Sequence, residues 1–165
     1  MKQMNKISCP NCGQEINVDE VLSHQLQDEL KKEYGYYELV YINVNSGTNS
    51  IPTATVTVKM GNKEYSDSST GDGPVDALFN AIDRALNIQP KIESYQVRSV
   101  TSGREALGEV IVRIRNEDKS FNGRGISTDV IEASGKAYIK AINQQEIYKE
   151  EQVSIRDVDS VTNVV

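Results

Sequence analysis

The chain has 165 residues, 38% of them apolar and 25% charged, a composition that fits a folded protein with room for one ordinary domain and short additions. A formal net charge of −6 argues against binding to a phosphate backbone, and no apolar run is long enough for a membrane span or a signal peptide. Cys9 and Cys12 cannot build a disulfide framework, so we expect a cytoplasmic protein with neither nucleic acid nor membrane as a partner.

Residues 1–34 form an N-terminal addition with its own character. Cys9 and Cys12 have the Cys-x-x-Cys spacing of half a zinc ribbon, and the apolar spacing after Asp19 predicts a short helix. A structural zinc needs four ligands, and this segment offers the two cysteines and His24. Either two chains pool their cysteine pairs around one zinc ion, or the segment is an unmetallated turn that leads into a helix. We favour the turn.

The next stretch, residues 36–87, has the pattern of three strands followed by a helix. ELVYINVNSG ends in a turn, and TATVTVKM alternates apolar residues with threonine, as a half-buried strand does. Gly61-Asn62 then predicts a hairpin into a third strand. Pro74 marks the first turn of the helix, because its missing N–H costs nothing there.

The same pattern occurs a second time. Shifting the sequence by 56 residues, without a gap, places Val56 on Val112 and Ala77 on Ala133, and it also places Ser46-Gly47 on residues 102–103. We therefore predict an α+β fold in which residues 35–143 form a duplicated βββα unit with internal pseudo-twofold symmetry. The tail, residues 144–165, is polar and then weakly β-like, and the sequence assigns it no function.

Each predicted helix carries alanines at every fourth position. The two stripes consist of Ala77, Ala81 and Ala85 and of Ala133, Ala137 and Ala141. Small side chains on one helix face let another backbone come close. The stripes predict either tight packing of helix on sheet or a helix–helix contact across a dimer, and the first is favoured.

The two helix starts have distinctive chemistry. TGDGPVD offers Asp72 or Gly73 as a cap, and Asp129 caps the second helix with Glu132 at capping-box spacing. A helix start attracts an anion, but the acids oppose phosphate, whereas an α-amino acid brings both a carboxylate and an ammonium group. The alternative is that these are well-capped helices and nothing more.

Four ordered motifs give the chain a family resemblance. NSGTNSIPTATVTV, GDGPVDALFNAIDRAL, GREALGEVIV and GRGISTDVIEASGKAYIKAIN together resemble the C-terminal regulatory domain of 2-isopropylmalate synthase. The resemblance covers residues 36–143 and implies a pseudo-twofold βββα pair that forms a homodimer and binds leucine as the feedback inhibitor of leucine biosynthesis. It implies a leucine site at the first helix start, the fourth strand, the turn and strand after it, and the second helix approach. Carried onto this sequence, its residues are Asp72, Gly73, Val75, Ile92, Tyr95, Ser99, Ala106, Gly108, Ile126 and Asp129.

The resemblance also implies what this chain does not do by itself. The family's catalytic part is a separate TIM barrel of about 250 residues, which 165 residues cannot supply. We therefore expect a non-catalytic regulatory domain without a cofactor of its own, with a structural zinc at Cys9 and Cys12 as the alternative to the unmetallated turn. It is either a fragment of a longer enzyme or a free-standing sensor. The alternatives are an isoleucine-binding domain like that of citramalate synthases, a ligand-free dimerisation scaffold, and a zinc-knuckle protein that binds a partner.

Overall fold

The structure is a computed structural model that describes residues 6–8, 15–17, 36–101 and 106–162, with side chains from 36–101 and 106–153. The chain divides into two compact units, Met1–Gly35 and Tyr36–Val165. In the first unit, β1 (Lys6–Ser8) pairs antiparallel with β2 (Glu15–Asn17). Cys9, Cys12, His24 and the helix predicted from Asp19 lie outside the described residues.

The compact unit Tyr36–Val165 confirms the predicted α+β fold. Two three-stranded antiparallel sheets have the strand orders β3-β4-β5 and β6-β7-β8, and each sheet is followed in sequence by a helix. The first βββα unit consists of β3 (Glu38–Gly47), β4 (Ser50–Met60), β5 (Lys63–Thr70) and α2 (Pro74–Leu86). The second consists of β6 (Lys91–Ser99), β7 (Gly108–Asn116), β8 (Lys119–Ser127) and α3 (Val130–Thr162).

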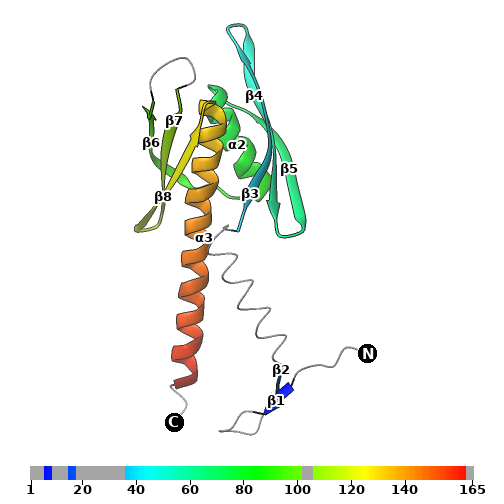
Figure 1. The fold of residues 1–165 in the computed structure, drawn as a ribbon, viewed down its shortest axis with the longest axis vertical. Coiled ribbons are helices and arrows are strands. Elements are labelled where there is room, and N and C mark those ends of the chain that lie inside the picture. The colour runs from blue at the N-terminus through cyan, green and yellow to red at the C-terminus, as the bar shows by residue number, and fades with distance from the viewer. Residues whose placement is uncertain (1–5, 9–14, 18–35, 102–105, 163–165) are drawn as a thin grey trace. The chain divides into compact units, whose positions relative to one another are not determined.

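The two helices lie between the two sheets and share one core (Figure 1). Helix α2 packs on β4 and β5, helix α3 packs on β7 and β8, and the helices also contact each other. The strands supply their inward-facing side chains to this core, which are Ala54, Val56, Val58, Val110, Val112 and Ile114. On the outer face of the first sheet the hydroxyl groups of Thr55 and Ser68 lie 2.8 Å apart. The period-two alternation predicted for this strand is therefore confirmed.

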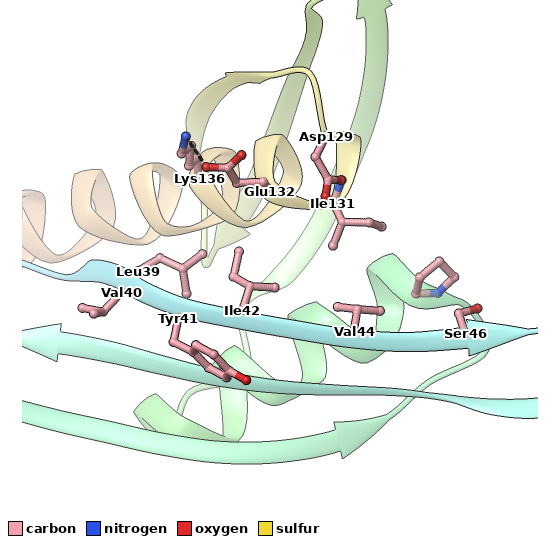
Figure 2. A pocket seen from close by; sticks show the side chains of 11 residues that line it. Leu39, Val40, Tyr41, Ile42, Val44, Ser46, Asp129, Ile131, Glu132 and Lys136 are labelled. Atoms are coloured by element: carbon pink, nitrogen blue, oxygen red, sulfur yellow. Dashed lines mark hydrogen bonds and ion pairs between the residues drawn. The ribbon is translucent and has the colours of Figure 1, made fainter. Parts of the chain in front are cut away.

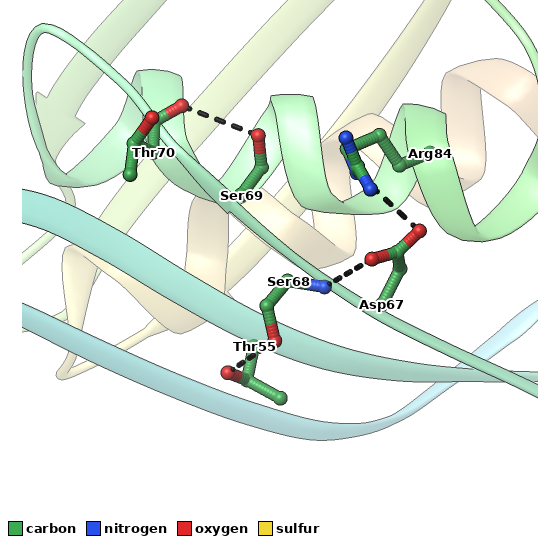
Figure 3. A network of polar contacts seen from close by, with 6 residues as sticks. All are labelled: Thr55, Asp67, Ser68, Ser69, Thr70 and Arg84. Carbon is green, nitrogen blue, oxygen red and sulfur yellow. Dashed lines mark hydrogen bonds and ion pairs between the residues drawn. The ribbon is translucent and has the colours of Figure 1, made fainter.

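Polar contacts fasten α2 to the edge strand β5. The Arg84 guanidinium lies 3.3 Å from the Asp67 carboxylate, which also accepts a 2.7 Å hydrogen bond from the Ser68 N–H (Figure 3). This backbone hydrogen bond, helped by Arg84, lowers the pKa of Asp67. Because the pair is exposed, it orients the helix end more than it stabilises the fold.

The strand registers correct the prediction of a repeat without a gap. Ile42 pairs with Val56 and Tyr95 pairs with Val112, so the first strands of the two units are related by 53 residues and the later strands by 56. Both first strands carry a register shift at the same place, next to Leu39 and next to Ile92. The chain is three residues longer between Tyr95 and its partner Val112 than between Ile42 and its partner Val56. Ser46 therefore corresponds to Ser99 and not to residue 102.

The alanine stripes pack inside the single chain. Ala133, Ala137 and Ala141 are fully buried, and α3 lies directly on β8 because Gly123 and Gly125 have no side chains. A Cβ atom at Gly123 would lie 1.8 Å from the Ala137 carbonyl oxygen, closer than any real contact. The helix-on-sheet interpretation is thus confirmed, and this stripe is not available to a second chain.

The helices end differently. Helix α2 ends at Leu86, where Asn87 takes the left-handed conformation (φ 52°) typical of a helix C-terminus. The corresponding Asn143 is buried within α3, where its side-chain amide hydrogen-bonds both backbone groups of Tyr37, and this helix continues to Thr162. The weakly β-like tail predicted beyond residue 143 is therefore wrong. Its Gln, Glu and Lys residues favour a helix. Within the described residues, no helix is both long and apolar enough to cross a membrane.

Candidate functional site

The start of α2 is open. Gly73 is the N-cap and Pro74 follows it, as predicted, and no side chain from the described residues caps the helix. The Asp76 carboxylate instead accepts hydrogen bonds from the Asp72 N–H (3.0 Å) and the Asn80 amide (3.2 Å). A Cβ atom at Gly73 would meet nothing within 4 Å. The first turn of α2 therefore has no side-chain cap, and the space around its N-cap Gly73 is open.

The start of α3 is capped by a side chain. The Asp129 carboxylate accepts a 2.8 Å hydrogen bond from the Ile131 N–H. The predicted capping box is only half formed, because Glu132 binds the Lys136 ammonium (2.7 Å) and the Ser127 hydroxyl (2.5 Å) instead of the Asp129 N–H. The Lys136 contact, followed by the Ser127 hydrogen bond, lowers the pKa of Glu132. This helix start therefore carries charges of both signs.

Two of the predicted site residues on β6 reach toward the helices. The Tyr95 ring stands edge-on to Phe79 of α2 with centroids 6.1 Å apart, and its hydroxyl lies 2.9 Å from the Ser134 hydroxyl of α3. Tyr95 nevertheless remains 36% exposed and Ile92 39% exposed. Both pair with residues whose side chains are buried in the core, so they face inward without being covered.

The remaining predicted residues lie near the β6–β7 connection. Ser99 pairs with Gly108, which pairs in turn with Ser127 just before α3. Ala106 is half-buried and follows a stretch outside the described residues. Ile126 pairs with Glu109, so strand alternation puts it on the opposite face of the sheet from Gly108. The structure therefore does not bring Ile126 together with Ile92 and Tyr95.

The residues that do enclose a groove lie on β3 and at the helix starts. A groove of about 540 Å³ runs between β3 and the start of α3, and Pro74 of α2 also lines it. Leu39, Ile42 and Val44 point from the strand toward the helix, and Tyr41 points away (Figure 2). Asp129 is the only predicted site residue in its lining. The sequence signal that could have identified the other groove residues is the internal repeat, aligned with the 53-residue offset that the β-sheet registers show for the first strands.

Two βββα units that share a helical interior, with the start of α3 beside the apolar residues of β3, define a small pseudo-twofold α+β domain. The chain belongs to the LeuA allosteric (dimerisation) domain family, whose model matches residues 17–146.

Three relatives of this chain share one name. A 2-isopropylmalate synthase of Carboxydothermus hydrogenoformans is 42% identical over 76% of this chain and 25% of its own length. Those of Ruminiclostridium cellulolyticum and Pyrococcus furiosus are both 48% identical, over 61% and 72% of this chain and 20% and 24% of their own lengths. The chain thus spans about a quarter of the length of these relatives.

Proposed function

We propose that this chain is a non-catalytic regulatory domain that binds leucine as a feedback inhibitor of a 2-isopropylmalate synthase and forms a homodimer. The proposal rests on its membership of an allosteric and dimerisation family and on relatives that are all named 2-isopropylmalate synthase. Condensation chemistry belongs to parts of those relatives that this chain does not match. A cytoplasmic location agrees with this role.

The observation that carries leucine binding is the uncapped start of α2. Its free N–H groups suit the leucine carboxylate, and an acid such as Asp72 suits the ammonium group. Val75 lies on the same turn, and the exposed faces of Ile92 and Tyr95 offer apolar surface for the isobutyl group. Ligand binding would remove this apolar surface from water, which favours a branched aliphatic side chain over glycine.

The homodimer requires a surface other than the buried alanine stripes. Besides the residues proposed for the leucine site, exposed apolar side chains lie on β6 and at both ends of the β6–β7 connection, namely Val97, Val100 and Leu107. We place the dimer contact on this surface, because contiguous exposed apolar side chains mark interaction sites. Light scattering should give twice the chain mass at micromolar concentration, and a monomer there would contradict the dimer.

Leucine binding is tested by thermal unfolding and calorimetry. Leucine should raise the melting temperature, by an amount equivalent to about 2.7 kcal/mol at a hundredfold excess over Kd, and glycine should not. Gly73→Asp should abolish this shift, because its carboxylate would cap α2 as Asp129 caps α3 and would repel the ligand carboxylate. The fold should survive, because the added Cβ atom meets nothing.

Asn62→Asp is the matched control, because it adds the same charge in the exposed β4–β5 turn. Its leucine response should equal that of the wild type. If the chain binds isoleucine in preference to leucine, the result supports the alternative of an isoleucine-binding domain like that of citramalate synthases. If calorimetry detects no heat with either amino acid at millimolar concentration, leucine binding is contradicted and the ligand-free dimerisation scaffold is the remaining alternative.

A further inference from the structure

The β-sheet registers relate the groove beside β3 to the proposed leucine site. Residues at the same register position in the two units are called counterparts here. On the first strands, Leu39 and Ile42 are the counterparts of Ile92 and Tyr95, and the same 53-residue offset relates Ser46 to Ser99. At the helix starts, Asp129 and Ile131 are the counterparts of Gly73 and Val75. Five residues that line or border the β3 groove thus correspond to five residues of the proposed leucine site.

The two places differ in what fills them. Phe79 of α2 stands against Tyr95, whereas its counterpart on α3 is Gly135, and side chains of the first βββα unit occupy the space beside it. A Cβ atom at Gly135 would lie 2.6 Å from a Leu39 methyl carbon and 3.2 Å from an Ile42 methyl carbon. The missing side chain lets these residues form the apolar floor of the groove.

The helix end of the groove supplies polar partners. Asp129 and Glu132 are acids on the first turn of α3, and the Lys136 ammonium lies one turn further along. Asp129 uses one carboxylate oxygen for its cap, and the other oxygen is free to accept a hydrogen bond from an ammonium group. Lys136 is half exposed and can turn from Glu132 to a ligand carboxylate. An apolar floor with both charges at one end matches an α-amino acid with an aliphatic side chain.

We propose that this groove is a second amino-acid site, which takes a branched-chain amino acid and is related to the first site by the internal pseudo-twofold axis. The choice of ligand rests on the proposed function. The location of the site does not, because it follows from the register, the groove and its charges. In the second site Lys136 holds the ligand carboxylate, whereas in the first site the backbone N–H groups of α2 hold it. Each chain therefore binds two molecules.

The test is a titration of the whole chain with leucine that reads both stoichiometry and position. Calorimetry should give two molecules per chain for the wild type and one for Gly73→Asp. It should also give one for Lys136→Glu, because the reversed charge repels the carboxylate. Lys140→Glu, an equally exposed lysine one turn along α3, is the control and should retain two. Backbone amide NMR signals of Ser46 and Ile131 should shift with leucine in Gly73→Asp and not in Lys136→Glu.

The outcomes separate the two proposals. A single site that Gly73→Asp removes, without shifts at Ser46 or Ile131, overturns the second site and leaves the first. A single site that Lys136→Glu removes and Gly73→Asp leaves intact supports the β3 groove and overturns the first. Absence of binding to the wild type at millimolar leucine overturns both.

Discussion

The Tyr138 hydroxyl of α3 donates a 2.7 Å hydrogen bond to the Asp83 carboxylate of α2, and so joins the two βββα units across their shared interior. The Tyr138 ring stacks on Phe79 with centroids 4.3 Å apart. Burial, followed by the neighbouring Asp83 charge, raises the pKa of Tyr138, so its hydroxyl remains a donor at every working pH. Sequence periodicity placed these residues on helices, but nothing in the spacing paired them.

This contact predicts a pH dependence of stability. Burial raises the pKa of Asp83 to about 6, against the opposing effect of the Tyr138 hydrogen bond. The folded chain then holds this proton more tightly than the unfolded chain, so the Asp83 contribution is present below pH 4 and is lost as the pH rises through 6. With allowance for partial exposure, the loss amounts to about 1–2 kcal/mol.

Asp83→Asn should remove this loss and stabilise the chain near pH 7, while it retains an acceptor for the Tyr138 hydroxyl. The measurement is the free energy of urea unfolding at pH 4.5 and 7.5 in the variant and the wild type. Asp118→Asn, an exposed carboxyl in the β7–β8 turn, is the control and should leave the wild-type slope unchanged. An identical slope in Asp83→Asn would contradict the assignment.

Asn143 of α3 holds the segment just before β3 in place. Its side-chain oxygen accepts a 2.7 Å hydrogen bond from the Tyr37 N–H, and its amide donates a 2.9 Å hydrogen bond to the Tyr37 carbonyl. Asn143→Ala would leave both backbone groups without these partners, so urea unfolding should show a loss of about 1–3 kcal/mol. The exposed Lys140→Ala should cost less than about 0.5 kcal/mol. Equal effects of the two variants would argue against the role given to Asn143.

Gly123 is where β8 and α3 come closest. Gly123→Ala would force its Cβ atom against backbone atoms of α3, which cannot turn aside as a side chain can. We expect a loss above about 3 kcal/mol, seen as a large drop in melting temperature or a failure to fold. Gly73→Ala, with open space around its added Cβ atom, should leave the melting temperature within a few degrees of the wild type.

Zinc at the N-terminal addition is a separate prediction. If two chains share one ion through Cys9 and Cys12, elemental analysis of the purified dimer should find about half an equivalent per chain. The double variant Cys9→Ser, Cys12→Ser should then contain none and should keep its leucine response, because the proposed leucine sites lie in the other unit. Metal-free wild-type protein would favour the unmetallated turn.

The repeat and the family were readable from the sequence because they depend on local signals. Strand alternation, the Gly61-Asn62 turn and the alanine spacing each reflect a period of one element, so residues far apart in the chain are not needed to see them. The alignment without a gap missed the 53-residue offset between the first strands. The longer connection after β6 shifts these strands, and few identical residues mark their correct alignment. Only the hydrogen-bonded registers could show that Ile42 corresponds to Tyr95 in the repeat.

The sequence by itself determined the α+β class, the duplicated unit, the caps of both helices and the family that suggests a leucine ligand. The tertiary structure decided which surfaces remain open. Gly123 and Gly125 let α3 lie on β8, which buries the alanine stripe, while Gly135 lets Leu39 and Ile42 of β3 pack against α3. The sequence shows only a glycine at each of these three positions. Whether a backbone or a side chain fills the space that each glycine leaves depends on what the fold places opposite it.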